Sequence, residues 1–268
     1  MKRSLFLGLI VLLLAGCNLK KSDEVVRTTN YTYEEYYPLM DGRVDSLHIA
    51  IAVEFPEKVP NDDLLEPIQQ NIKSEIFGDA YQYMDIKQAI EAFTAMLKTE
   101  YRQNNLPVAE ERRAENDPAL DAILNEEQII SSMVMDVHNY ILSYAVERYV
   151  FMGGAHGSNY RIFYNYDLNT GEQLHEEDIF VEGYEEPLTE LLLSNMVAQN
   201  EDVELIDDLK RYGYNVDEIL PNDNFFLTDS SLVYVFNPYD IAPYSLGETE
   251  ISIAYDQLQD LLQTPERF

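Results

Sequence analysis

The chain has 268 residues, of which 49 are Asp or Glu and 18 are Lys or Arg, giving a formal net charge of −31 at pH 7. Such an acidic surface repels phosphate, which argues against a nucleic-acid partner and disfavours direct adhesion to anionic lipid. It would steer a cationic partner towards the protein, although acidic surfaces also keep exported proteins soluble without a specific partner. With one Cys, no disulfide can form within the chain, so the fold depends on its apolar core.

The N-terminus has the pattern of a bacterial lipoprotein signal. Two basic residues precede an apolar run at residues 5–14, which is too short for a comfortable membrane span. The run ends in Leu-Ala-Gly-Cys, and Cys17 occupies the position that would carry the lipid. An ordinary cleaved signal or a short anchor helix is the alternative, and the position of the single Cys favours the lipoprotein. We therefore predict a signal peptide at residues 1–17 and a polar tether at residues 18–29.

The first half of the remaining chain predicts strands followed by helices. A Tyr- and Thr-rich segment at residues 30–38 favours a strand, and the Asp-Gly pair that follows favours a hairpin turn. Residues 46–55 alternate clearly, with His48 opposite the large apolar residues, so we interpret His48 as a half-exposed sheet residue. Apolar residues at helical spacing predict helices at residues 64–78 and 85–101. The charged, aperiodic stretch from Pro107 to Pro118 predicts an exposed connector.

The second half returns to strands around a Tyr-rich segment. Two β-rich runs are joined by a turn around His138 and Asn139, and a glycine-rich turn, Gly-Gly-Ala-His-Gly, follows at residues 153–157. The next strand has a period of two between Tyr160 and Tyr166. The elements expected after it are a short edge at 176–180, helices at 188–197 and 203–212, strands at 225–228, 232–236 and 250–254, and a closing helix at 256–262.

These elements predict an α+β fold, with antiparallel sheets and helices packed on one face. We expect two consecutive subdomains, at residues 30–151 and 152–268. A mature chain of this size can form one large or two small domains without disulfides.

No catalytic constellation is found in the sequence. It contains no HExxH, no Cys/His metal cluster, no GxSxG and no phosphate-binding loop. His156 is either a general base or metal ligand, or a turn residue hydrogen-bonded to a neighbouring strand, and the lack of a partner at suitable spacing favours the turn. His175 lies among acidic residues that could bind Ca²⁺, but a solvated acidic turn fits the spacing better. We predict no catalytic residue, no metal and no cofactor.

The tyrosines are the other feature that can indicate a binding surface, with 20 Tyr and no Trp. Tyr239 and Tyr244 lie in a loop with two prolines, where they can either form a contact surface or pack the loop onto the sheet. The predicted ligand-binding residues are His156, Tyr160, Tyr239 and Tyr244.

Two stretches of the C-terminal half carry a resemblance to a known family. The first runs from the glycine-rich turn through Asp-Leu-Asn-Thr-Gly to Asp-Ile-Phe at residues 178–180, and the second is Asn-Phe-Phe-Leu-Thr at 224–228 with the Asn-Pro-Tyr-Asp-Ile-Ala-Pro-Tyr loop. Together they resemble the C-terminal ectodomain of RsiV, the lysozyme-sensing anti-sigma factor. The region from Tyr31 to Phe151 is similar to the companion domain found there and in the polysaccharide deacetylase PdaC.

The resemblance implies an α+β ectodomain without catalysis of its own. In the anti-sigma factor this domain pair binds lysozyme, but the present chain has a lipobox in place of a spanning helix and no sigma-binding segment. Transmembrane signalling is therefore not expected, and lysozyme binding does not follow from the fold alone.

These observations predict a lipid-anchored, non-enzymatic binding protein of the cell envelope. It would lie outside the cytoplasm, at the outer membrane or cell surface, with the lipid as its only membrane contact. Its partner would be a cationic protein such as lysozyme, or a cell-wall glycan. A cell-wall-modifying enzyme using His156 and a carboxylate near Asp178 or Asp240 is a second hypothesis, and a structural envelope lipoprotein is a third.

Overall fold

A computed structural model describes residues 26–41, 45–111 and 123–268. The predicted signal peptide, Cys17 and most of the predicted tether lie outside these residues. The first strand already begins at Arg27, so the last residues assigned to the tether belong to the sheet.

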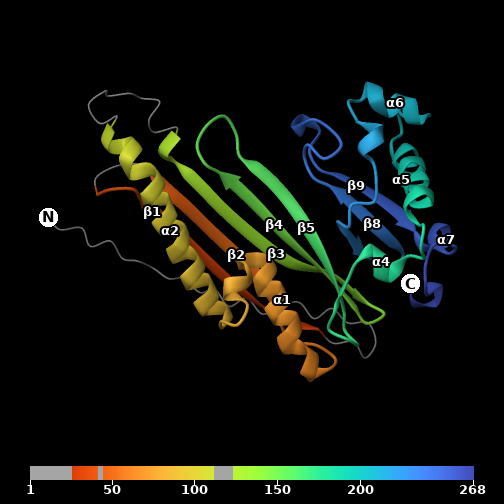
Figure 1. Ribbon diagram of the computed structural model, residues 1–268, viewed down its shortest axis with the longest axis horizontal. Coiled ribbons are helices and arrows are strands. Elements are labelled where there is room, and N and C mark those ends of the chain that lie inside the picture. The colour runs from red at the N-terminus through yellow and green to blue at the C-terminus, as the bar shows by residue number, and fades with distance from the viewer. Residues whose placement is uncertain (1–25, 42–44, 112–122) are drawn as a thin grey trace.

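The larger sheet has six strands, arranged in space in the order of the sequence (Figure 1). All neighbouring pairs are antiparallel except β2 and β3, which run parallel. The parallel pair requires a long crossover, and two helices supply it between β2 and β3. The strands are β1 (Arg27–Pro38), β2 (Ser46–Lys58), β3 (Glu126–His138), β4 (Ile141–Phe151), β5 (Ser158–Asp167) and β6 (Gln173–Leu174).

The crossover helices, α1 (Leu65–Phe77) and α2 (Ile86–Glu111), cover one face of this sheet (Figure 1). Their apolar stripes meet the alternating apolar residues of β2 in one core, which buries residues such as Ile49, Ile51 and Ile72 completely or almost completely. Both helices were expected from the sequence.

The predicted connector at residues 107–118 is wrong as far as Glu111, because α2 continues through Pro107. Contacts with the start of β3 hold this extension. The Tyr101 hydroxyl donates to the carbonyl of Leu124 at 2.8 Å, and the Asn105 amide donates to Glu126 at 2.6 Å. The other residues of the predicted connector, 112–118, lie outside the described part of the chain.

The smaller sheet contains β7 (Phe225–Leu227), β8 (Ser231–Phe236) and β9 (Thr249–Ala254), all antiparallel. One of its faces packs on α5 (Glu185–Gln199), and the other packs on the large sheet through residues such as Phe163, Phe226 and Val235. Four layers result in the order helices, large sheet, small sheet, helix (Figure 1). Shorter helices flank the small sheet: α4 (Glu176–Ile179), α6 (Ile206–Arg211) and α7 (Tyr255–Leu258).

The expected fold class is confirmed: the chain is α+β, with largely antiparallel sheets and two consecutive parts. The predicted subdomain boundary, after Phe151, falls between β4 and β5, which pair within the large sheet. The sheet continues across this point, and the division at residue 151 stays a prediction. None of the described helices is long and apolar enough to cross a bilayer.

Candidate binding site

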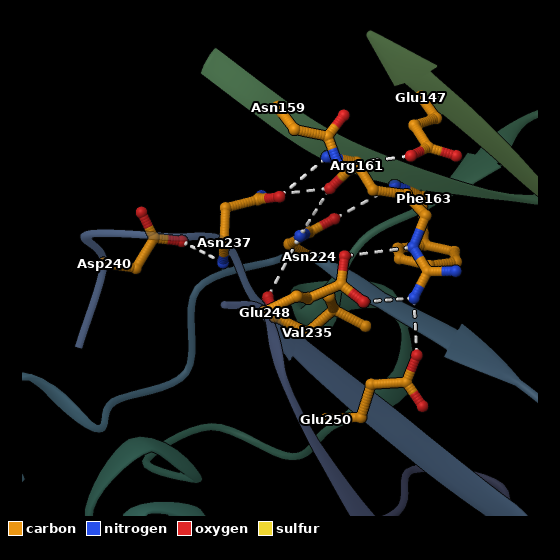
Figure 2. A network of polar contacts seen from close by, with 10 residues as sticks. All are labelled: Glu147, Asn159, Arg161, Phe163, Asn224, Val235, Asn237, Asp240, Glu248 and Glu250. Atoms are coloured by element: carbon orange, nitrogen blue, oxygen red, sulfur yellow. Dashed lines mark hydrogen bonds and ion pairs between the residues drawn. The ribbon is translucent and has the colours of Figure 1, made fainter. Parts of the chain in front are cut away.

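The free edge of β5 is where the two parts of the chain join. β6 pairs with only two residues of β5, at Asn165 and Tyr166, so the preceding stretch has a neighbouring strand on one side only. Asparagine side chains take the place of the missing strand (Figure 2). Asn237 accepts from the Arg161 backbone N–H at 2.7 Å and donates to the Arg161 carbonyl at 3.0 Å. Asn224 accepts from the backbone N–H of Phe163 at 3.0 Å and donates to the same Arg161 carbonyl at 3.1 Å.

The side chain of Arg161 strengthens this junction. Its guanidinium forms ion pairs with Glu248 and Glu250, next to and on β9, and lies 5.0 Å from the centre of the Phe163 ring (Figure 2). Burial alone would lower the pKa of Arg161, but the two carboxylates outweigh it and raise that pKa. The pKa of Glu248 is raised, because burial together with repulsion from Glu250 and Glu147 outweighs the lowering effect of Arg161. The guanidinium of Arg161 is therefore the shared ion-pair partner of Glu248 and Glu250.

The junction fixes the proline loop that follows β8. The backbone N–H of Asn237 donates to the Asp240 carboxylate at 2.7 Å, and the N–H of Tyr239 donates to the carbonyl of Ala242 at 3.1 Å. Tyr239 has a φ of 78°, a value that is uncommon for a bulky residue and costs conformational energy. The loop holds its ring outwards, with 63% of the residue exposed.

Three predicted binding residues meet at this loop in an aromatic stack, which we define as His156, Tyr239 and Tyr244. The rings of His156 and Tyr244 are 4.8 Å apart between centroids, with 21° between their planes. The Tyr239 ring lies 5.5 Å from Tyr244 at 32°. Two loops more than 80 residues apart in sequence thus form one partly exposed patch.

The glycine-rich turn brings His156 to this position. Gly153 has a φ of 75°, and a Cβ atom there would lie 2.6 Å from the carbonyl oxygen of Ile123, so only glycine fits without a shift. The His156 ring nitrogen Nδ1 lies 2.9 Å from the carbonyl oxygen of Gly157. Within the described residues, no carboxylate forms a hydrogen bond or ion pair with this ring, so neither Asp178 nor Asp240 is its partner.

Tyr160 is not part of the aromatic stack. Side chains alternate along β5, and Arg161 points to the small sheet, so Tyr160 lies on the opposite face of the large sheet. It is exposed there, at 38%. Cys17 lies outside the described residues.

A pocket of about 370 Å³ adjoins the proline loop that follows β8. Asn237 and Asp240 contribute to it from the proline loop, and Glu218, Leu220, Pro221 and Asn222 contribute from the segment before β7. No pattern in the sequence indicates this pocket, because its lining combines residues from three separate segments. The lining consists of Ile162, Glu218, Leu220, Pro221, Asn222, Asn224, Phe236, Asn237 and Asp240.

A second polar cluster surrounds His175, beside a pocket of about 280 Å³. The ring nitrogen Nδ1 of His175 lies 2.6 Å from Asp223, while Glu176 is 7% exposed and accepts hydrogen bonds from the hydroxyls of Tyr184 and Tyr234. Burial and the neighbouring Glu176 raise the pKa of both tyrosines. The prediction of a solvated acidic turn is therefore wrong for Glu176, whose carboxylate also accepts from the backbone N–H of Asp223 and ties α4 to the segment before β7. The sequence could not show this, since Asp223 and Tyr234 are remote in the chain.

No group of three or more His, Cys, Asp or Glu residues in the described ranges is arranged to hold a metal ion. The site is a surface of rings and carboxylates on a rigid junction between two sheets. Such a surface is suited to contact and charge recognition.

Comparison with known proteins agrees with this architecture. Residues 177–256 match the model of a family described as a protein of unknown function, DUF3298. A crystal structure of a DUF3298 family member from Bacteroides fragilis superposes with a TM-score of 0.83 at 26% identity, covering 90% of this chain and 95% of that one.

A DUF3298 family protein from Pseudomonas aeruginosa has the same fold, with a TM-score of 0.61 at 18% identity, covering 91% of this chain and 97% of its own. No curated protein sequence matches the chain.

Proposed function

We propose that this protein is a lipid-anchored binding protein of the bacterial cell envelope, without catalysis of its own, that captures a cationic protein such as lysozyme. The observation that carries the proposal is the aromatic stack, in which Tyr239 is exposed at a strained backbone position beside Tyr244 and His156. Tyrosines supply large contact area at low entropic cost, and they are enriched where proteins bind one another.

Charge supports a cationic partner. The formal net charge of −31 would attract a basic protein from solution and increase its rate of association. The junction itself carries acidic residues around the stack, including Asp240, Glu248 and Glu250, of which only the last two are paired with Arg161.

The more specific parts of the proposal come from the sequence. The lipobox ending at Cys17 supports attachment to the membrane by lipid and a location outside the cytoplasm. The resemblance of the two C-terminal stretches to the RsiV ectodomain supports lysozyme as the first cationic protein to test.

The test is to remove rings from the aromatic stack. The full chain in neutral detergent micelles should bind immobilised lysozyme, and Tyr239→Ala with Tyr244→Ala should weaken binding at least tenfold, as expected for central aromatic contacts. Tyr83→Ala is the control, because Tyr83 is 78% exposed and lies in the turn before α2, more than 70 residues from His156 in the sequence. Equal binding by all three proteins would rule out the stack as the capture surface.

A cell-wall glycan is the second candidate ligand, since sugar rings also stack on exposed aromatic side chains. Salt separates the two candidates: capture of a basic protein weakens as salt rises, whereas binding of a neutral glycan does not. A wall-modifying enzyme would use His175 with Asp223 and Glu176, because a histidine and two carboxylates line one pocket there. Release of soluble fragments from purified peptidoglycan, abolished by His175→Ala, would support that activity.

A further inference from the structure

The 370 Å³ pocket beside the aromatic stack has apolar walls. Ile162 comes from β5, Phe236 from the end of β8, and Leu220 and Pro221 from the segment before β7. Leu220 is 47% exposed, so an apolar residue forms part of the accessible rim. The volume is within the range of small-ligand sites.

The polar groups of the pocket differ in whether they already have hydrogen-bond partners within the protein. The amides of Asn222, Asn224 and Asn237 are each engaged with backbone groups that hold β5, β8 and their connections. The Oδ2 atom of Asp240 accepts from the backbone N–H of Asn237, which leaves Oδ1 available to a ligand. The Glu218 carboxylate is exposed and makes no hydrogen bond or ion pair with the described residues.

The groups left for a ligand are therefore carboxylate oxygens at an apolar pocket. Carboxylates accept hydrogen bonds and cannot donate them when ionised. A sugar needs both donors and acceptors, whereas an ammonium or guanidinium group needs acceptors alone. The walls match the other half of such a ligand, because lysine and arginine carry their charge on an apolar stem that packs along apolar surface.

We propose that this pocket binds a lysine or arginine side chain of the captured protein, with its stem against Leu220 and Pro221 and its charge between Glu218 and Asp240. This inference rests on the proposed function and names the group that the site recognises. The turn at residues 237–240 presents Tyr239 to the aromatic stack and Asp240 to the pocket, so one partner surface can contact both.

The test uses a minimal probe, N-acetyl-lysine-N-methylamide, titrated into the full chain in neutral micelles and followed by NMR. We expect saturable binding that is at least five-fold tighter than binding of the norleucine analogue, which has a comparable apolar stem and no charge. Glu218→Gln should weaken the lysine probe about five-fold, the loss expected for one partly exposed ion pair. Asp217→Asn is the matched control, because it removes the same charge from the neighbouring residue, which does not line the pocket.

Three outcomes would overturn the inference. They are absence of saturable probe binding, equal binding of the norleucine analogue, and an equal loss in Glu218→Gln and Asp217→Asn, which would indicate diffuse charge attraction. Lysozyme capture measured on the same proteins separates the two proposals. If the protein captures lysozyme but does not bind the probe, the proposed role of the pocket is wrong and the proposed function stands. If the unmodified chain does not capture lysozyme, the proposed function itself is wrong.

Discussion

Asn224 shows how a single side chain can join two sheets. It is 7% exposed, accepts from the backbone N–H of Phe163, and donates to the carbonyls of Arg161 and Val235. These three bonds satisfy backbone groups on two different sheets at once. A buried amide of this kind cannot be replaced by solvent, because the surrounding layers exclude water.

We predict that Asn224→Ala lowers the free energy of unfolding by about 1–3 kcal/mol, since it leaves the buried backbone N–H of Phe163 without a partner. The carbonyls of Arg161 and Val235 keep the amides of Asn237 and Asn222 as donors. Urea denaturation followed by circular dichroism measures the change. Asn159→Ala serves as the control, because the Asn159 amide makes one bond, 3.2 Å long, to the side chain of Glu147. Its cost should stay within about 0.5 kcal/mol, and equal costs for the two variants would contradict the role assigned to Asn224.

Residues of this type set the limit of what the sequence could predict. Tyr239, Tyr244 and His156 were identifiable because aromatic residues in a proline loop and a glycine-rich turn are unusual. Asn224 and Glu218 carry no such signal, since each looks like an ordinary loop residue until distant segments meet. Tyr160 is predicted together with these three residues, but the pleat of β5 places it on the other face of the large sheet.

At the scale of elements, the glycine-rich turn between β4 and β5 determines where His156 lies. Gly153 combines a positive φ with close contact to the backbone of Ile123. Any side chain at this position would have to displace backbone, which is more costly than moving the end of a flexible side chain.

Gly153→Ala should therefore lower the free energy of unfolding by roughly 1–3 kcal/mol. It should also weaken lysozyme binding, because the turn that carries His156 must shift. Ala155→Ser, in the same turn at an exposed residue, should leave both quantities unchanged within error. Thermal denaturation and binding to immobilised lysozyme provide the two readouts, and a Gly153→Ala protein that matches Ala155→Ser in both would refute the prediction.

Individual elements were easier to predict than their limits. The strands and helices with strong periodicity, such as β2 and α1, follow the sequence pattern closely. The end of α2 does not, because Pro107 has low helix propensity and the segment is held by contacts of Tyr101 and Asn105. Tertiary contacts of this kind cannot be inferred from local sequence.

The whole molecule is held together by layers that bury many tyrosines. Four of them, Tyr144, Tyr166, Tyr234 and Tyr255, are at most 9% exposed, and burial is the main cause that raises the pKa of each. The parallel pairing of β2 with β3 and the packing of the small sheet on β4 and β5 were not predicted. Both depend on contacts between segments that are far apart in the chain.

These tyrosines predict a steep loss of stability in alkali. Because their pKa values are raised in the folded state, their contribution is fully present below the ordinary tyrosine value of 10.0 and is lost as the pH rises above it. Each should remove about 1.4 kcal/mol per pH unit once the unfolded chain ionises. The part of the tyrosinate absorbance that comes from these buried tyrosines should therefore appear together with the loss of the dichroism signal, above that pH. Complete tyrosine titration near pH 10 with an intact dichroism signal would contradict the burial of these side chains.

The central claim is that the protein captures a cationic protein through a specific surface, and calorimetry with lysozyme tests it most directly. The full chain in neutral micelles should bind lysozyme saturably at low salt, and binding should weaken but persist at moderate salt, because aromatic contacts remain when charges are screened. Binding that disappears at moderate salt would reveal only nonspecific attraction to an acidic surface. No binding at either salt concentration would contradict lysozyme capture outright.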